Sequence, residues 1–518
     1  MKRLKTKEMF FKAGIIVLGL IVCAGFVLTP FDGNVKVFMG GAKQAAYLSD
    51  NILIGSYMEW ELKGVFNRMW FYLLYKLASL FSVFPSYSFE VIVNAFFTFA
   101  AVISIFISIH FVFDNFAYKK KFFYTLLSCI LLFSTYINCH LEPEMTCQII
   151  LLVALGLYIN AINKDKTTGI QLFASGLLIG SLFYFKSILI LLSVCVVAVA
   201  GIWLEHSGKK HSMKRLMTVV AGSIAMLVLN GILIYFINPS EFQSMANASI
   251  YQHTLLSSMS TKALTSAIHK FCRNYIKQSI PGMPFLLVGS AALICNFIRW
   301  IKCKELKLIF WHAICWLFPM LAIILSNKFY IYHYVSFFLP SAVEIVELGY
   351  KRTSGSKIFI SSVSIVAIAV YILFISVFSD NFRYYVRTET EVFDNNLRVL
   401  ETAAIDENAQ MLYLDDGKGS FYIGNASYLT EYFPLSLQRL PEASANKTHK
   451  ESLAEAIAYN GKYISLYDSW FFINDNNKSL KKKLEEEYML LTTYETFSIG
   501  SDIFETPKPT EMEIWVRK

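Results

Sequence analysis

Charged residues are scarce in this sequence. Only 16% of the 518 residues are Asp, Glu, Lys or Arg, whereas roughly a quarter is usual for a soluble domain. Hydrophobic residues make up 55%, aromatic residues make up 16%, and the mean hydropathy is +0.47. A soluble core cannot absorb this much apolar surface. The composition therefore excludes an ordinary soluble protein and predicts an α-helical polytopic membrane protein.

Cysteines at disulfide or metal-ligand spacing are also lacking. The nine cysteines lie between Cys23 and Cys315, mostly inside apolar segments, and residues 380–518 contain none. Neither a disulfide framework nor a CxxC metal pair is therefore predicted. The net charge of +9 does not indicate nucleic acid as a partner, because most Lys and Arg stand in short clusters between apolar runs. In that position they act as topology signals.

Apolar runs of the length that crosses a bilayer predict about eleven transmembrane helices. They cover residues 12–30, 90–113, 121–138, 145–162, 168–185, 187–204, 215–237, 283–300, 307–326, 332–349 and 357–379. The first of them follows a basic stretch, but no small-residue cleavage site follows the long apolar run. It is therefore expected to remain as a helix. The centres of these spans carry almost no charge.

Two stretches are too long for one crossing. Residues 170–203 would extend about 50 Å as one helix, and the only charge among them, Lys186, stands at the midpoint. This charge predicts a tight hairpin at the membrane surface. Residues 309–346 are interrupted by the polar, Tyr-rich patch Asn327 to Tyr334, which predicts an interfacial turn.

The basic clusters fix the expected orientation. If the N-terminus is cytoplasmic, the loops at 119–121, 164–166, 209–215, 299–307 and 351–357 all face the cytoplasm, and all of them are basic. This is the positive-inside pattern of a multi-pass protein of the plasma membrane. Residues 1–380 are then the membrane domain, with a first outer loop at 31–90, and residues 381–518 form an extracytoplasmic domain.

The C-terminal region has a different pattern from the membrane domain. Helical apolar spacing occurs at 391–404 and 450–458, while 411–414, 463–466 and 513–516 have the composition of short strands. These segments predict a small α/β domain.

The first outer loop carries the earliest candidate for chemistry. Asp32 stands where the first predicted helix ends, and a carboxylate at the membrane surface is placed to deprotonate an acceptor hydroxyl. A solvated helix end is the alternative interpretation.

The same loop continues with a charged and aromatic stretch at 57–68, which contains Glu59, Glu61, Lys63 and Arg68. An amphipathic helix there would offer Lys63 and Arg68 to a phosphate group. An interfacial anchor without a ligand is the alternative.

Short turns between helices supply further polar groups. His140, Glu142 and Glu144 fill one such turn, although helix capping alone could explain Glu144. A divalent metal on these residues is possible but not expected, because no second His lies at ligand spacing. Lys186, Lys328 and His333 are predicted on the same side of the membrane, and snorkelling to headgroups is the alternative for the two lysines.

In its order of elements the chain resembles the GT-C superfamily of membrane glycosyltransferases, especially protein O-mannosyltransferases and bacterial aminoarabinose transferases. Asp32 matches the acidic residue that the family places after its first helix. Residues 57–65 are similar to its "Tyr...Glu-Lys-Pro-Pro-Leu" stretch, but Gly64 and Val65 replace the prolines. Residues 180–187 and 332–340 are similar to its "Gly-Leu-Ala-Phe-Leu-Thr-Lys" and "Arg-Tyr-x-Leu-Pro-x-x-Pro" elements.

The resemblance implies an inverting transfer from a polyprenyl-phosphate sugar to a glycan, lipid or protein hydroxyl at the outer face, with no cofactor. Asp32 would be the general base, and Lys63, Arg68 and Lys186 would bind the donor phosphate. Possible substrate contacts are Glu59, Glu61, His140, Glu142, Glu144, Lys328 and His333. A transporter or lipid-linked glycan flippase is the main alternative, since such proteins also carry intramembrane charges. A noncatalytic scaffold is a third possibility.

Overall fold

The computed structural model describes part of the chain. The described segments are chiefly 65–82, 143–163, 168–209, 212–237, 261–279, 283–326, 331–350, 410–414, 457–466, 479–498 and 508–518. They divide between two compact units, the first made of residues 1–29, 95–229 and 255–380, and the second of 30–94, 230–254 and 381–518. The described part of the first unit is helical, and the second contains a β-sheet.

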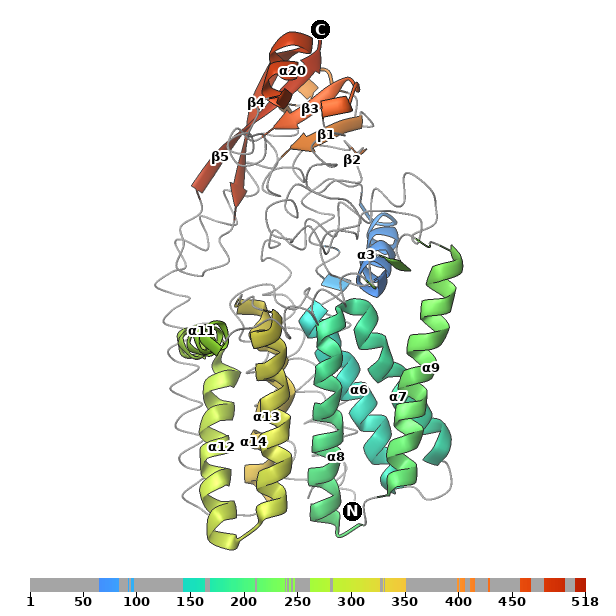
Figure 1. Ribbon diagram of the computed structural model, residues 1–518, viewed down its shortest axis with the longest axis vertical. Helices are drawn as coiled ribbons and strands as arrows, with labels where there is room; N and C mark the ends of the chain where they lie inside the picture. The colour runs from blue at the N-terminus through green and yellow to red at the C-terminus, as the bar shows by residue number, and fades with distance from the viewer. Residues whose placement is uncertain are drawn as a thin grey trace. The chain divides into compact units, whose positions relative to one another are not determined.

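Long apolar helices form the first unit, with α6, α7, α8, α12 and α13 running roughly side by side (Figure 1). They are α6 (Pro143–Asn163), α7 (Thr168–Phe185), η3 (Ser187–Leu192) with α8 (Ser193–Ser207), α9 (Met213–Ile237), α12 (Pro284–Cys303), α13 (Leu306–Ser326), and η4 (Ile331–Phe337) with α14 (Phe338–Tyr350). Five of the described helices, α6, η3–α8, α9, α12 and α13, are long and apolar enough to cross a membrane. The predicted spans between 145 and 349 thus correspond to observed helices. Those at 12–30, 121–138 and 357–379, and almost all of 90–113, lie outside the described residues.

The chain folds back at Lys186, as its sequence predicts. Lys186 has an extended backbone (φ −166, ψ 116) between α7 and the 3-10 helix η3. At the far end of α8, the Nζ of Lys209 donates to the carbonyl oxygen of Ile162 at 2.8 Å. The end of α8 therefore lies beside the end of α6, which only a hairpin at Lys186 allows.

Small residues let the helices approach closely. A Cβ added to Gly201 of α8 would lie 2.5 Å from the ring of Trp311 on α13. A Cβ on Gly176 of α7 would lie 2.1 Å from the carbonyl oxygen of Val219 on α9, and Ser223 donates to the Gly176 carbonyl at 3.0 Å. Such contacts replace the hydrophobic driving force that is absent between helices in lipid.

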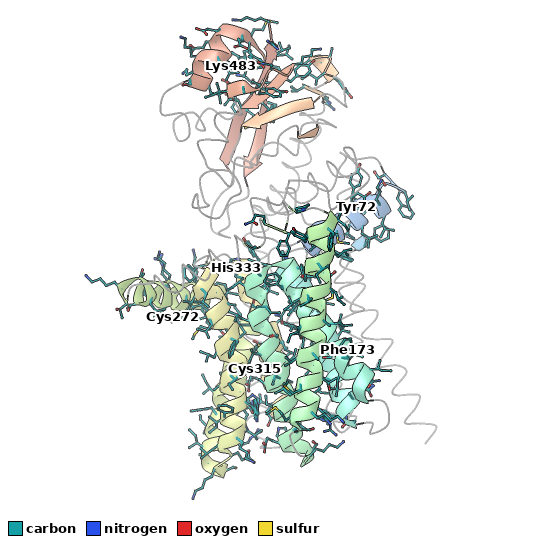
Figure 2. All side chains as sticks on the ribbon, turned by 45° about the vertical axis from the view of Figure 1, so that its right-hand side comes forward. Tyr72, Phe173, Cys272, Cys315, His333 and Lys483 are labelled. Atoms are coloured by element: carbon teal, nitrogen blue, oxygen red, sulfur yellow. The ribbon has the colours of Figure 1, made fainter. Side chains whose placement is uncertain are left out.

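One helix crosses the direction of the others. Helix α11 (Thr261–Ser279) is seen nearly end-on in Figure 1 and extends sideways from the bundle in Figure 2. It lies in the segment 238–281 for which the sequence predicts only a loop. Its apolar and charged residues alternate with helical period, so it is amphipathic and falls below any hydropathy threshold for a span.

The second unit contains a five-stranded mixed sheet of order β2-β1-β3-β5-β4. The strands are β1 (Gln410–Leu414), β2 (Ser427–Tyr428), β3 (Tyr463–Leu466), β4 (Tyr488–Ser498) and β5 (Lys508–Arg517). Strands β1 and β3 are parallel, and β5 is antiparallel to both β3 and β4. Helix α20 (Ser479–Glu487) packs Leu480 and Leu484 against Ile464 and Leu466 of β3.

The predicted strands at 411–414, 463–466 and 513–516 are β1, β3 and part of β5, whereas β4 is not predicted from the sequence. The predicted helices at 391–404 and 450–458 lie mostly outside the described residues.

Candidate functional site

Three of the sequence candidates come from separate elements and meet at one end of the helical bundle. Glu144 stands in the first turn of α6, Lys186 in the break between α7 and η3, and His333 in η4. Figure 2 labels His333 near the end of the bundle from which α11 extends. They are separated by almost two hundred residues along the chain, so only tertiary packing brings them together.

The three side chains form a compact polar cluster. The Lys186 Nζ lies 2.6 Å from the Glu144 Oε1 and 3.1 Å from the His333 Nε2. The same Glu144 oxygen is 3.4 Å from the His333 Nε2. All three residues are buried, with exposed fractions of 8% for Lys186, 1% for Glu144 and 3% for His333. The Lys186 ammonium is therefore paired inside the protein, and Glu144 contacts it in addition to standing in the first turn of its helix.

A neighbouring glutamine fixes η4 against α6. Gln148, one turn after Glu144, accepts a hydrogen bond from the backbone N–H of Leu339 at 3.1 Å through its Oε1. Its Nε2 donates to the carbonyl oxygen of Ser336 at 3.4 Å. These bonds hold the end of η4 on the helix that carries Glu144, and so they constrain the position of His333 relative to Lys186.

The charges in this cluster suit an exchangeable anion. Lys186 and Glu144 compensate each other, and a buried pair of this kind is stable only while both partners are present. A phosphate group entering beside Lys186 and His333 would find a cation and a hydrogen-bonding imidazole in a setting of low dielectric, where electrostatic attraction is stronger than in water.

The other predicted site residues are not brought together by the described structure. Arg68 lies in α3 (Val65–Ala78), a helix of the second unit. The remainder lie outside the described residues: Asp32, Glu59, Glu61, Lys63, His140, Glu142 and Lys328. Among the residues that the structure does describe, no group of three or more His, Cys, Asp or Glu could hold a metal ion.

A second buried polar cluster was not anticipated. Glu344 of α14 is completely buried, and its carboxylate is 2.5 Å from the His312 Nδ1 of α13. It also accepts hydrogen bonds from the Asn296 Nδ2 at 2.8 Å and from the Trp316 Nε1 at 3.2 Å. The predicted span at 332–349 therefore contains a buried carboxyl group in its C-terminal half.

One turn further along α14, Glu347 contacts α12 again and also reaches α8. Its carboxylate oxygens lie 2.6 Å from an Arg299 guanidinium nitrogen of α12 and 2.7 Å from the His206 Nε2 of α8. Glu344 and Glu347 together connect α14 to α8, α12 and α13. Their spacing of three residues, which places both on one helix face, was the available signal. An average over a hydropathy window hides it.

Comparison with known proteins finds similar folds among solved structures but no match by sequence. No protein-family model matches the sequence, and no curated protein matches it significantly. Among solved structures, ArnT from Cupriavidus metallidurans bound to undecaprenyl phosphate is similar, with a TM-score of 0.58, 10% identity, and coverage of 97% of each chain.

The oligosaccharyltransferase AglB from the archaeon Archaeoglobus fulgidus, in complex with an inhibitory peptide and a dolichol-phosphate, is also similar. Its TM-score is 0.52 at 12% identity, with 97% of this chain and 76% of AglB covered. The GT-C resemblance inferred from the sequence is therefore confirmed at the level of fold. The chain shares the fold of ArnT and AglB.

Proposed function

We propose that this protein is a GT-C glycosyltransferase that transfers a sugar from a polyprenyl-phosphate donor to an acceptor hydroxyl. The observation that supports it most directly is the convergence of Lys186, Glu144 and His333 in one buried cluster. The cluster lies at one end of a bundle whose fold is that of two proteins crystallised with polyprenyl phosphates. The donor phosphate carries the charge that such a cluster is suited to bind.

The proposed reaction is a single displacement at the outer face of the membrane. The acceptor oxygen bonds to the anomeric carbon while the bond between that carbon and the phosphate oxygen breaks, so the anomeric configuration inverts. The acceptor proton passes to Asp32, and the electron pair leaves with the lipid phosphate. Lys186, with Lys63 and Arg68, stabilises the charge on the leaving oxygen, a kind of interaction that commonly contributes several kcal/mol.

In this proposal Glu144 positions Lys186 and does not touch the sugar. The remaining candidates contact donor or acceptor: Glu59, Glu61, His140, Glu142, Lys328 and His333. The acceptor is a glycan, lipid or protein; an Archaeoglobus fulgidus oligosaccharyltransferase of similar fold was crystallised tethered to an acceptor peptide. We expect no metal requirement, because cationic side chains can neutralise a phosphate monoester.

The test is transfer by purified protein supplied with radiolabelled polyprenyl-phosphate sugars and membrane extract as acceptor. Asp32→Asn and Lys186→Ala should each lower the rate at least a hundredfold, because each removes a group used in the displacement. Lys302→Ala is the matched control, since it removes an exposed lysine in the last turn of α12, a residue that is not part of the proposed site. Equal rates for the wild type and the first two variants would refute the proposed site.

A transporter or lipid-linked glycan flippase is the second candidate, and the Glu344–His312 contact favours it. Ionisable residues buried between membrane helices often mark a pathway for ions or substrates. Reconstituted vesicles distinguish the two functions. A flippase would move a labelled polyprenyl-phosphate sugar between leaflets without cleaving it, whereas a transferase would release the lipid phosphate.

A further inference from the structure

Helix α11 is basic throughout and contains no acidic residue. Its sequence, TKALTSAIHKFCRNYIKQS, has Lys262, Lys270, Arg273 and Lys277 in addition to His269. At 100° per residue the four cations fall within one arc of about 80° on the helix. This arc is opposite the face that packs against the bundle. The cations therefore lie on one side of the helix and form a basic strip along it.

A second exposed strip runs beside the first. Leu264, Ile268, Cys272 and Ile276 follow each other at intervals of four residues, so they lie in one row along the helix. All four are exposed: Leu264 is 40% exposed, Ile268 43% and Ile276 62%, and Cys272 is also exposed. A row of exposed aliphatic side chains beside a row of cations is typical of a helix that lies in a membrane interface.

The third face attaches α11 to the bundle. The ring of Phe271 stacks on Tyr334 of η4 at a centroid distance of 5.8 Å, and the Tyr334 hydroxyl donates to the Phe271 carbonyl oxygen at 3.3 Å. Tyr275 shares a hydrogen bond of 2.7 Å with Ser290 of α12, and burial raises the pKa of its hydroxyl. Helix α11 is thus fixed to η4, the element that carries His333.

The orientation of α11 decides between possible partners. It runs across α12 and α13, which have the length and composition of membrane spans, so its axis is roughly parallel to the bilayer plane (Figures 1 and 2). Residues 261–270, the half that extends from the bundle, are exposed except for Ala267. A helix in this position contacts the lipid headgroups and the boundary between headgroups and acyl chains. The basic strip favours anionic headgroups over neutral ones.

We propose that α11 binds anionic phospholipids, with its apolar row at the acyl–headgroup boundary and its basic strip on the lipid phosphates. Because α11 packs on η4, this binding also holds η4 at the membrane surface. The proposal does not depend on the sugar-transfer reaction, since it concerns the lipid around the protein and not the donor. A neutral bilayer offers the apolar row the same contact but presents no anionic headgroups to the basic strip.

The native Cys272 provides the probe, because it lies in the middle of the apolar row. The full-length protein is spin-labelled and placed in nanodiscs of neutral lipid or of neutral lipid with about 30% phosphatidylglycerol. Collision with oxygen and with a water-soluble nickel chelate then reports the depth of the label. Cys272→Ser, labelled in the same way, gives the background from other cysteines.

With anionic lipid the label should be protected from nickel and accessible to oxygen, and 0.5 M salt should reduce this protection. Replacing the exposed Lys262, Lys270 and Arg273 by Gln should lower the ratio of bound to unbound helix by about a hundredfold, because each charge near an anionic surface contributes roughly a factor of five. The matched control replaces the exposed Lys214, Lys302 and Lys304 by Gln and should change nothing.

Ile268→Asn with Ile276→Asn tests the apolar row separately and should expose the label to nickel in both lipids. A label equally open to nickel in neutral and anionic nanodiscs would overturn the proposal. So would protection that is the same in both lipids and unaffected by the loss of the three charges, because binding would then not require anionic headgroups.

Discussion

Lys186 and Glu144 carry opposite charges at a separation of 2.6 Å, and both are buried. In such a pair each charge is tolerated because the other is present. Removal of one partner leaves an uncompensated charge in a poorly solvated position, which typically costs 3–5 kcal/mol, whereas replacement of both partners is often close to neutral. Single and double variants of this pair can therefore separate its contribution to the stability of the protein from its contribution to sugar transfer.

We predict that Glu144→Gln and Lys186→Met each lower the thermal unfolding midpoint in detergent, and that the double variant recovers most of the loss. Sugar transfer should not recover in the double variant, because Lys186, the proposed ligand of the donor phosphate, is still absent. Unfolding followed by intrinsic fluorescence gives the first quantity, and radiolabel transfer gives the second. Recovered transfer in the double variant would show that the pair has only a structural role.

The sequence allowed these residues to be selected singly but not as a group. Lys186 is conspicuous because it is the only charge in a long apolar run, and Glu144 because it follows a proline at a helix start. Their contact depends on how α6 packs beside α7 and η3, which no local pattern encodes. The assigned roles of Asp32 and Lys63 stay predictions, since those residues lie outside the described part of the chain.

Among the elements, α14 is short for a membrane helix but is tied to three others through its two glutamates. Glu344 binds groups on α12 and α13, and Glu347 binds groups on α8 and α12. Polar contacts of this kind hold helices together in lipid, where apolar surfaces give no preference for each other over lipid. Because α14 continues directly from η4, these contacts also anchor the segment that carries His333.

Glu347→Gln should therefore destabilise the bundle by about 3 kcal/mol, because the charge of Arg299 then loses its buried counter-ion. The control is Glu486→Gln. Glu486 contacts Lys482 at 3.7 Å, and both side chains are exposed, so the change should cost less than about 1 kcal/mol. The two midpoints of thermal unfolding are compared in the same detergent. Equal shifts in the two variants would contradict an anchoring role for Glu347.

The prediction of helices and strands succeeded where a segment is uniform in hydropathy. Residues 168–185 are uniformly apolar and bounded by polar groups, and α7 begins and ends at those residues. It failed where a helix mixes properties: α11 alternates apolar and basic residues, so a hydropathy window interprets it as a loop. Strand β4 was missed because Tyr488–Ser498 is mostly polar on one side and pairs with β5 only in the folded sheet.

On the scale of the whole molecule, the positive-inside pattern predicts which side of the membrane each end of α12 faces. The positions of α11 and of the turn between α12 and α13 allow this orientation to be tested. Helix α11 precedes the start of α12, and Cys303 ends α12 at the turn into α13. The two positions are thus at opposite ends of a span of 20 residues, about 30 Å long. The basic loop at 299–307 predicts that the Cys303 end is cytoplasmic.

A membrane-impermeant maleimide applied to intact cells should therefore label a cysteine at position 262 but not Cys303. Lys262→Cys is suitable because Lys262 is exposed and lies on the basic strip of α11, away from the apolar row. Two variants are compared. The first combines Lys262→Cys with Cys272→Ser and Cys303→Ser, and the second carries Cys272→Ser alone and so keeps Cys303. Among the described cysteines, each variant then has a single exposed thiol. Permeabilised cells should label both positions. If Cys303 reacted first in intact cells, the orientation would be reversed, and the Lys186 cluster would face the cytoplasm, where a donor displayed on the outer leaflet could not reach it.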